Sequence, residues 1–315
     1  MALTLNEIES TTQEFWEKGA ADVYYKGNVL IYTMLKDAKP WDGGTYIRQV
    51  LDYGQPLGSD FNASSTFNTN KVETMTAARW TPAYYYEPIT YDIDDVVKNA
   101  GVAQEVDIVN QKLTKAAKHI RSKLADALYA YDTVGTGYGA SGKKLVGLLG
   151  MISASVTYGG IAVADLAEWT AGAVTATAEP ITFSTIDALL TSCLVGDDMG
   201  DEPNLLITTR TLFSAIRNLT LPHLRLEHGD LADVGVKNID YLGNPIVRDY
   251  KCPSGYFFAL NKNYMGFRVH KDFNFKRSPW ARPTDQYLFT CQIIAVLQMI
   301  CKRRDAHGYH SNFTA

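Results

Sequence analysis

The sequence predicts an α+β fold in which a long arm projects from a compact body. Three observations support this expectation. A Gly-Gly turn at 43–44 opens a β-rich, Thr- and Asn-rich stretch that is too long for a compact hairpin, an aromatic and proline-rich segment follows at 80–88, and one long amphipathic helix comes next. An arm that cannot bury both of its faces within one subunit needs a neighbouring chain. The sequence therefore points to a protein that works by assembling.

Composition limits the classes of function. The 315 residues are 46% hydrophobic, which is enough for a real core. With 30 basic and 34 acidic side chains the net charge is −4. This charge argues against a protein whose main task is to bind nucleic-acid phosphates, although a container for nucleic acid need not bind it tightly. Residues 1–10 lack a basic region and an apolar region, and no stretch approaches a membrane span, so folding in a cytoplasm is expected. The four cysteines are dispersed without a CxxC pair, which favours reduced structural thiols.

The first ninety residues predict two arms. Residues 5–18 are helix-like, and the apolar, Tyr-rich segment 19–34 lacks periodicity, so this region is interpreted as an extended arm with a short helix. Residues 45–53 and 71–77 have β-forming composition and flank a polar tip at 54–70. This pattern predicts a long hairpin arm.

A strand and a long helix are expected next. Residues 88–95 alternate apolar and polar side chains, which is the pattern of a half-buried strand. Between 102 and 131 apolar residues recur at three- and four-residue steps, which predicts a helix of about 40 Å that spans the molecule. Thr and Ala at several seam positions disfavour a coiled coil.

The second half predicts a separate compact region. The glycine-rich stretch 135–150 and the Ala/Thr/Gly-rich stretch 153–180 indicate loops and a variable surface element. The pattern then predicts a helix at 186–194, a buried strand at 204–208, a helix at 210–219, short strands and turns over 240–269, and a long apolar segment at 286–301, interpreted as a buried strand with a helix as the alternative.

Residues 137–143 match the spacing G-x-x-x-x-G-K of a phosphate-binding loop. Such a loop follows a strand and opens a helix, whereas this one follows a long helix. Lys144 also occupies the position of the Ser or Thr that binds Mg²⁺. A flexible glycine loop is therefore favoured over nucleotide binding.

Two histidine groups could supply metal ligands. His223 and His228 lie near Asp230, and His307 and His310 lie near the C-terminus. Neither spacing matches a ligand helix, and both groups fall in expected loops. Solvated or hydrogen-bonded histidines are the favoured interpretation.

Asp92, Asp94 and Asp95 lie at a strand end ahead of a helix, where acidic groups favour the helix dipole, so a structural role is favoured over a cation site. The serines lack a G-x-S-x-G elbow, and no cysteine has a recognisable histidine partner. No catalytic, cofactor-binding or metal-binding residue is predicted, and no cofactor.

Taken in order, the elements resemble the major capsid protein of tailed phages, which has the HK97-like fold. The resemblance covers nearly the whole chain: an arm at 1–40, WDGGTYIRQVLDYG (41–54) and KVETMTAARWTPAYYYEPITYDIDD (71–95) around an extended E-loop, and a 102–131 helix similar to the spine helix of a peripheral (P) domain. KKLVGLLGMIS, NLLITTR and YLGNPIVRDYKCPSGYFFALNKNYMGF are similar to an axial (A) domain core, and DQYLFTCQIIAVLQMICKRRDAHGY to the closing P-domain strand.

The resemblance implies a division of the chain. The expected parts are an N-terminal arm (1–40), an E-loop (41–87), a P domain with strand and spine helix (88–140), an A domain (141–264), closing P-domain strands (265–305) and a return to the A domain (306–315). It also implies that the E-loop contacts a neighbouring subunit through Arg48, Tyr53, Phe61, Phe67, Lys71 and Glu73.

As implied by the resemblance, the protein self-assembles as hexamers and pentamers into an icosahedral phage head that encloses double-stranded DNA without sequence-specific binding. A separate scaffolding protein, or a chain already trimmed, and a portal protein at one vertex are expected, with no membrane partner and no covalent cross-links. The protein would reside in the host cytoplasm before assembly and in the virion afterwards. Two alternatives stay open: an encapsulin-like compartment for protein cargo, and a soluble enzyme that uses His223, His228 and Asp230 or the glycine loop.

Overall fold

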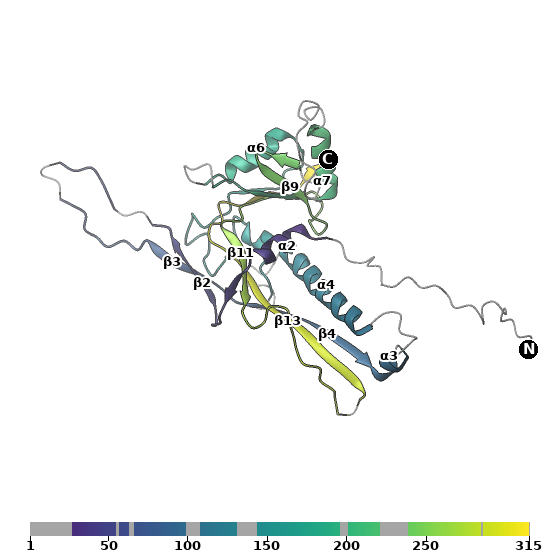
Figure 1. Ribbon diagram of the computed structural model, residues 1–315. Coiled ribbons are helices and arrows are strands. Elements are labelled where there is room, and N and C mark those ends of the chain that lie inside the picture. The colour runs from purple at the N-terminus through teal and green to yellow at the C-terminus, as the bar shows by residue number, and fades with distance from the viewer. Residues whose placement is uncertain are drawn as a thin grey trace, which may run out of the picture.

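The computed structural model describes residues 27–54, 57–62, 66–98, 108–130, 144–195, 201–220, 239–284 and 286–314. Figure 1 shows a body with an upper lobe around α6, α7 and β9, an elongated lower part formed by β4, β13 and α4, and an arm formed by β2 and β3 that extends to one side. The expected helix at 5–18 lies outside the described residues.

A five-stranded sheet forms the lower part of the body. Its central strand is β13 (Leu288–Cys301), which pairs antiparallel with β4 (Ala83–Asp92), β11 (Met265–His270) and β12 (Lys276–Arg277). The short β1 (Lys39–Trp41) adds to β11 in parallel. The strand interpretation of 286–301 is confirmed and the helical alternative is wrong, because the second half of β13 is buried on both faces and therefore reads as a continuous apolar run.

Four helices accompany this sheet. They are α2 (Val29–Lys36), α3 (Ile93–Lys98), α4 (Ile108–Tyr129) and α5 (Leu148–Met151). Helix α4 lies along β4 and contacts α2 and α5. The predicted long helix is confirmed over 108–129, a length of about 33 Å, while 101–107 and 131–134 lie outside the described residues. The expectation of a non-helical segment up to residue 34 is wrong from Val29 onward, because Leu30, Ile31 and Met34 share one helix face and are buried together.

Polar contacts also join α4 to β4. The carboxylate of Glu87 in β4 lies 2.8 Å from Nδ1 of His119 and 3.1 Å from Nζ of Lys123. Farther along the helix, Nζ of Lys112 donates to the carbonyl of Thr90 and to the carboxylate of Asp95. These partly exposed contacts fix the register of the helix on the strand, and burial supplies most of the stability.

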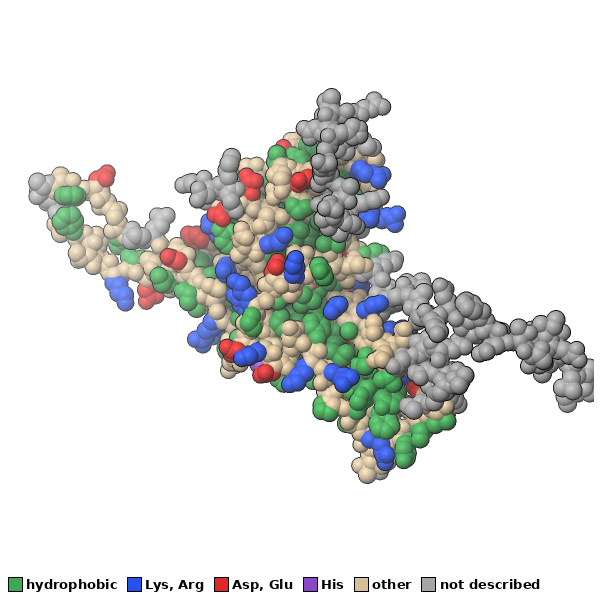
Figure 2. Space-filling model, in the orientation of Figure 1, with side chains coloured by type: hydrophobic (Ala, Val, Ile, Leu, Met, Phe, Trp, Pro, Cys, Tyr) green, Lys and Arg blue, Asp and Glu red, His purple; other side chains and the backbone are tan. Residues whose placement is uncertain are grey.

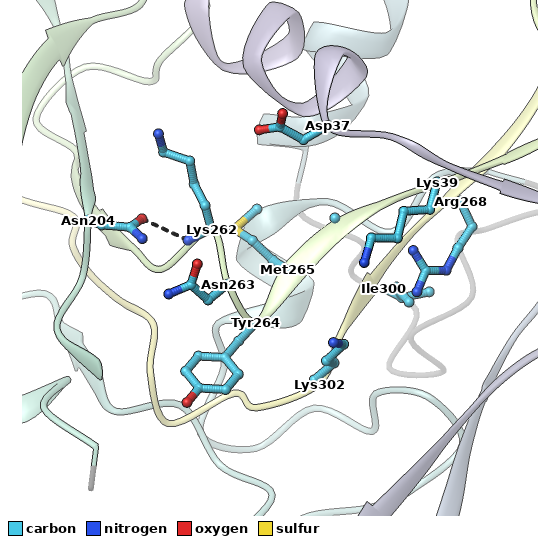
Figure 3. Close-up of a pocket in the computed structure, with 11 residues that line it drawn as sticks. Asp37, Lys39, Asn204, Lys262, Asn263, Tyr264, Met265, Arg268, Ile300 and Lys302 are labelled. Atoms are coloured by element: carbon cyan, nitrogen blue, oxygen red, sulfur yellow. Dashed lines mark hydrogen bonds between the residues drawn. The ribbon is translucent and has the colours of Figure 1, made fainter. Parts of the chain in front are cut away.

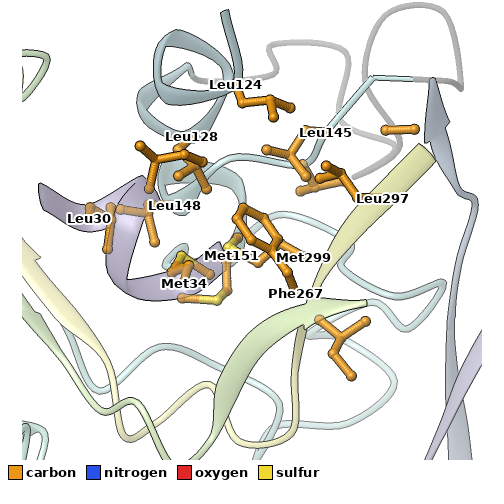
Figure 4. Packing of buried hydrophobic residues seen from close by; sticks show 14 of the residues in the cluster. Leu30, Met34, Leu124, Leu128, Leu145, Leu148, Met151, Phe267, Leu297 and Met299 are labelled. Carbon is orange, nitrogen blue, oxygen red and sulfur yellow. The ribbon is translucent and has the colours of Figure 1, made fainter. Parts of the chain in front are cut away.

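The main core lies where α2, α4 and α5 meet β11 and β13. Figure 4 shows its side chains: Leu30 and Met34 of α2, Leu124 and Leu128 of α4, Leu145, Leu148 and Met151 around α5, Phe267 of β11, and Leu297 and Met299 of β13. Burial of one such side chain stabilises the fold by roughly 1.5–3 kcal/mol. Residues from four distant parts of the chain therefore depend on one another.

A six-stranded sheet forms the upper lobe. Its strands run in the order β5 (Ala173–Thr175), β14 (Gly308–His310), β10 (Phe257–Leu260), β7 (Leu205–Thr208), β9 (Asn244–Arg248) and β8 (Ile239–Tyr241). Helices α6 (Phe183–Ser192) and α7 (Arg210–Thr220) pack against it, and β6 (Glu179–Pro180) pairs with β15 (Phe313–Thr314). The strand predicted at 204–208 and the helices predicted at 186–194 and 210–219 are confirmed, with α6 beginning three residues earlier, at Phe183, directly after its capping residue Thr182.

One expectation for this half of the chain is only partly right. The stretch 153–180 consists mostly of loops, as expected, but it is more than a surface element, because it contributes the short strands β5 and β6 and buries Tyr158 and Trp169 in the core.

Candidate functional site

The projecting arm is a two-stranded antiparallel ribbon at its root. Strand β2 (Ile47–Asp52) pairs with β3 (Met75–Trp80), with Ile47 opposite Trp80 and Asp52 opposite Met75. The strand predicted at 45–53 is confirmed over 47–52. The strand predicted at 71–77 is displaced towards 75–80, because Ala78 and Trp80 supply the buried face that holds the ribbon to the body.

The two faces of the ribbon differ sharply. On the inward face Ile47 and Leu51 are buried beside Ala78 and Trp80. On the outward face Val50 is 62% exposed and Met75 is 64% exposed. The root of the arm is therefore anchored, whereas its outward face is uncovered in the isolated chain.

The outer half of the arm exposes large apolar side chains. The described residues 57–62 and 66–74 form no strand, and nearly all of them are exposed. Phe61 and Phe67 are 68% and 66% exposed, and their ring centroids lie 5.3 Å apart. Figure 2 shows hydrophobic side chains gathered near the outer end of the arm. Exposed apolar groups on a projecting element mark an interaction surface.

The structure places all six predicted contact residues on the surface of this arm. Arg48 lies on the outward face of β2, Tyr53 is 37% exposed just beyond the ribbon, and Phe61 and Phe67 lie together in the outer half. Lys71 and Glu73 are exposed on the leg that returns to β3. Their contact with a neighbouring subunit stays a prediction.

A buried arginine, which the sequence analysis missed, organises the region beneath the arm. Arg304 is 1% exposed, and its guanidinium donates to the carbonyls of Met151 (2.7 Å), Ser153 (2.6 Å) and Trp169 (2.7 Å), and to that of Val156 at 3.4 Å. The charge has no carboxylate among these partners, so the backbone dipoles of one loop compensate it. The only signal in the sequence is a pair of arginines directly after the long apolar strand.

This loop in turn holds the root of the arm. The ring of Trp80 in β3 packs edge-on against Tyr158 at 5.6 Å, and Tyr158 packs against Trp169. Arg79 N donates to the carbonyl of Gly159 at 2.8 Å, and Gly159 has φ +62° and lies so close to Ala78 that a Cβ would clash. The direction of the arm is therefore set by packing against the loop that Arg304 organises.

The residues considered for metal binding fall into two groups. His307 is fully buried, its Nδ1 accepts from Asn261 N, and burial lowers its pKa to about 3. His310 lies in strand β14, and its Nε2 is 2.8 Å from Oε1 of Glu179. Both histidines are hydrogen-bonded as predicted, but the expectation that His310 lies in a loop is wrong. His223, His228 and Asp230, like the glycine segment 137–143, lie outside the described residues.

The aspartate cluster has the predicted structural role. Asp95 N donates to Asp92 Oδ1 at 2.8 Å at the start of α3, which begins at the end of β4, and the carboxylate of Asp95 accepts from Lys112. Across the described part of the chain, no group of three His, Cys, Asp or Glu residues is arranged to hold a metal ion. Within the same ranges, all four cysteines are free and no helix is long and apolar enough to cross a membrane.

Comparisons with known proteins give a consistent fold. No family model matches the sequence, and no curated protein matches it. The chain superimposes on a capsid subunit of Cyanophage A-1(L) with a TM-score of 0.70 and 15% identity over 99% of each chain. It superimposes on the capsid of the native GTA particle with a TM-score of 0.68 and 11% identity over 98% of this chain and 97% of that one. For the encapsulin complex of Synechococcus elongatus the TM-score is 0.62, with 9% identity over 99% and 96% of the two chains. The chain therefore has the α+β, HK97-like fold that these capsid and encapsulin subunits share.

Proposed function

We propose that this chain is the major capsid protein of a tailed phage and assembles as hexamers and pentamers into an icosahedral head around double-stranded DNA. The observation that carries the proposal is the arm, which is anchored at its root and uncovered over its outward face and outer half, on a body similar to capsid subunits over its whole length. The function is assembly, not catalysis.

The arm acts as the E-loop (41–87) in this proposal. Its outer half would lie across the adjacent subunit, where Phe61 and Phe67 lose their exposed area and Arg48, Lys71 and Glu73 make polar contacts at the rim. A contact of modest strength is repeated at every copy of a symmetric interface, so the shell as a whole becomes stable.

The rest of the chain divides accordingly. The P domain (88–140 and 265–305) contains the spine helix α4, strands β11, β12 and β13, and the second half of β4, and these elements would stiffen the subunit. The A domain (141–264) with the return segment 306–315 contains the six-stranded sheet and would surround the local symmetry axes.

Other partners follow from the same role. A separate scaffolding protein would guide assembly and a portal protein would occupy one vertex. The DNA would be enclosed without sequence-specific binding. A container need not bind its DNA tightly, so a net charge of −4 is compatible with this role. The protein would reside in the host cytoplasm before assembly and in the virion afterwards.

A protein compartment of the encapsulin type is the second candidate, because an encapsulin complex shares the fold with a TM-score of 0.62. The TM-scores alone do not separate the two candidates, because the cyanophage capsid scores 0.70 and the capsid of Mycobacterium phage Che8 only 0.59. The contents of particles purified from the native source separate the two: nuclease-resistant DNA supports a phage head, and a co-purifying protein cargo supports a compartment.

Shortening the arm tests the assembly function. Because Tyr53 N and Gly54 N both donate to the carbonyl of Thr74, residues 54–73 can be replaced by an Asn-Gly turn that closes the ribbon between Tyr53 and Thr74. The shortened subunit should melt within about 3 °C of the wild type, because the deleted segment contributes little core. It should form no regular shells when examined by mass photometry and electron microscopy.

The matched control keeps the arm at full length and changes one exposed polar residue, Ser59→Ala, which should assemble normally. Regular, stable shells from the shortened chain would show that the arm is not the assembly element. Loss of a catalytic activity that the intact chain displays would show that the protein is an enzyme instead.

A further inference from the structure

A basic pocket lies between the C-terminal end of α2, the start of β11 and the end of β13. It has a volume of about 480 Å³, and four cations line it, Lys39, Lys262, Arg268 and Lys302, with Asp37 as the one acidic residue. Figure 3 shows Lys39 and Arg268 close together, Lys302 on a neighbouring segment, and the side chain of Lys262 extending away from Lys39 and Arg268 on the opposite side.

The four cations form no ion pair within the part of the chain that the structure describes. Lys39 and Arg268 are directly opposite each other in the parallel pair of β1 and β11, an arrangement in which like charges repel. Among the described residues, no carboxylate forms an ion pair with any of the four. Among the described residues that line the pocket, four positive charges therefore face the single negative charge of Asp37.

The position of Arg268 makes this imbalance costly. The side chain is partly buried, and desolvation lowers its pKa. A cation removed from water without a counter-ion destabilises the fold, and a bound anion would reverse this effect.

The backbone that carries the pocket is held in place independently of any ligand. Asn261 is fully buried, and its Nδ2 donates to the carbonyls of Asp201 and Glu202, while its Oδ1 accepts from Asn263 N. Lys302 N donates to the carbonyl of Tyr264 at 2.7 Å. The turn before β11 and the residue after β13 are therefore fixed, so Lys262 and Lys302 emerge from a rigid frame.

Gly266 leaves open space in the wall of the pocket. Gly266 in β11 lines the pocket, and a Cβ added there would meet no atom within 4 Å. A side chain at this position would project into free space without a clash. A substitution at Gly266 can therefore change the pocket while all four cations stay in place.

We propose that this pocket binds the phosphate groups of a phosphorylated ligand. A single carboxylate would leave most of the charge uncompensated, whereas phosphate groups carry more charge and accept hydrogen bonds from several directions, which suits one guanidinium and three ammonium groups on separate segments. The volume lies within the range of about 300–1,000 Å³ that small-molecule sites occupy, so the pocket has room for more than one phosphate. The two sources of this chemistry are a free polyphosphate and the backbone of a nucleic acid.

Binding by the full-length protein tests the proposal with two probes, sodium tripolyphosphate and a 20-base-pair DNA duplex of random sequence. The double variant Lys39→Gln/Arg268→Gln should bind tripolyphosphate at least about 10-fold more weakly than the wild type in isothermal titration calorimetry. Lys271→Gln removes the same kind of charge from an exposed residue just beyond β11 that does not line the pocket, and its affinity should stay within about two-fold.

A second variant keeps the test decisive if the double variant fails to fold. Gly266→Glu places a carboxylate among the four cations and should abolish binding of tripolyphosphate, while its far-ultraviolet circular dichroism matches that of the wild type. Each variant is compared with the wild type only after its melting curve shows a folded protein.

The outcomes separate the sources. Tripolyphosphate binding without duplex binding supports a site for free phosphates. Binding of both probes supports contact with a nucleic-acid backbone, provided that the affinity for the duplex depends less on salt in the double variant than in the wild type. Wild-type protein that binds neither probe, or equal losses in the pocket variants and Lys271→Gln, would overturn the proposal. If neither probe binds and the double variant also fails to assemble, the pocket receives an acidic segment of a neighbouring subunit instead.

Discussion

At the scale of single residues, Arg304 organises the region beneath the arm. Its guanidinium is a planar fork whose donors reach backbone carbonyls of one loop, and its plane lies near the rings of Tyr158 (5.3 Å) and Trp169 (5.9 Å). A lysine has the same charge but cannot reproduce this geometry.

Replacement of Arg304 by lysine should therefore lower the free energy of unfolding by at least about 2 kcal/mol, because buried carbonyls lose their donors. Urea denaturation measures the effect. Arg303→Lys is the control, since Arg303 forms a partly exposed pair with Asp305 and should cost at most about 1 kcal/mol. Equal costs for the two variants would contradict a structural role for the buried guanidinium.

His307 makes the stability of the upper lobe depend on pH. Burial lowers its pKa from 6.5 to about 3, so between these values the unfolded chain binds a proton that the folded chain does not. The contribution of His307 to stability is thus fully present above pH 6.5 and declines as the pH falls towards 3.

From pH 7 to pH 5 the wild type should lose about 2 kcal/mol more stability than His307→Asn, which retains an acceptor for Asn261 N but does not titrate. Urea denaturation at the two pH values gives this difference. Parallel losses in both proteins would show that His307 is accessible to protons in the folded state.

At the scale of elements, α4 and β13 hold the lower part of the body together. Ile120, Leu124 and Leu128 of α4 are fully buried against segments from both ends of the chain, while β13 pairs with three other strands. A defect in the middle of either element disturbs the whole core.

Leu124→Pro should destabilise the protein by about 3 kcal/mol or more, because it removes a hydrogen bond in mid-helix and a buried side chain. We expect a low yield of soluble protein and a lower melting temperature. Lys115→Ala, an exposed change on the same helix, should be close to neutral. Wild-type melting of Leu124→Pro would contradict the position of this residue inside the helix.

At the scale of the whole molecule, the hydrophobic core and the proposed assembly surface lie in separate parts of the chain. Among the described residues, the body contains two hydrophobic core clusters, and 57–62 and 66–74 of the outer arm contribute no residue to either. Changes in the outer arm should therefore affect association while the subunit stays folded.

The double substitution Phe61→Ser/Phe67→Ser tests this separation. The stability of the subunit should change by less than about 0.5 kcal/mol, since both rings are exposed and contact each other. Shells should form less completely, or dissociate at lower denaturant concentration, as followed by light scattering. Asn68→Ser, a polar change on the same segment, should assemble as the wild type does; a similar defect in this control would argue against a specific role for the two rings.

The sequence by itself determined the elements that carry a strong local pattern. The helix seen at 108–129, the strands within 45–53 and 286–301, and the helices of the upper lobe follow from hydrophobic periodicity, which depends only on neighbouring residues. The order of these elements also predicted the shared fold.

Only the tertiary structure decided the features that depend on residues far apart in the chain. The position of β3 depends on its pairing with β2. The helix at 29–36 and the buried side chains of Tyr158 and Trp169 depend on packing partners far away in the sequence. The hydrogen bonds from Arg304 to backbone carbonyls join segments from both halves of the chain, and so does the basic pocket around Arg268. No local pattern encodes these two features. The carbonyls that accept from Arg304 and the cations that line the pocket come together only when the chain is folded.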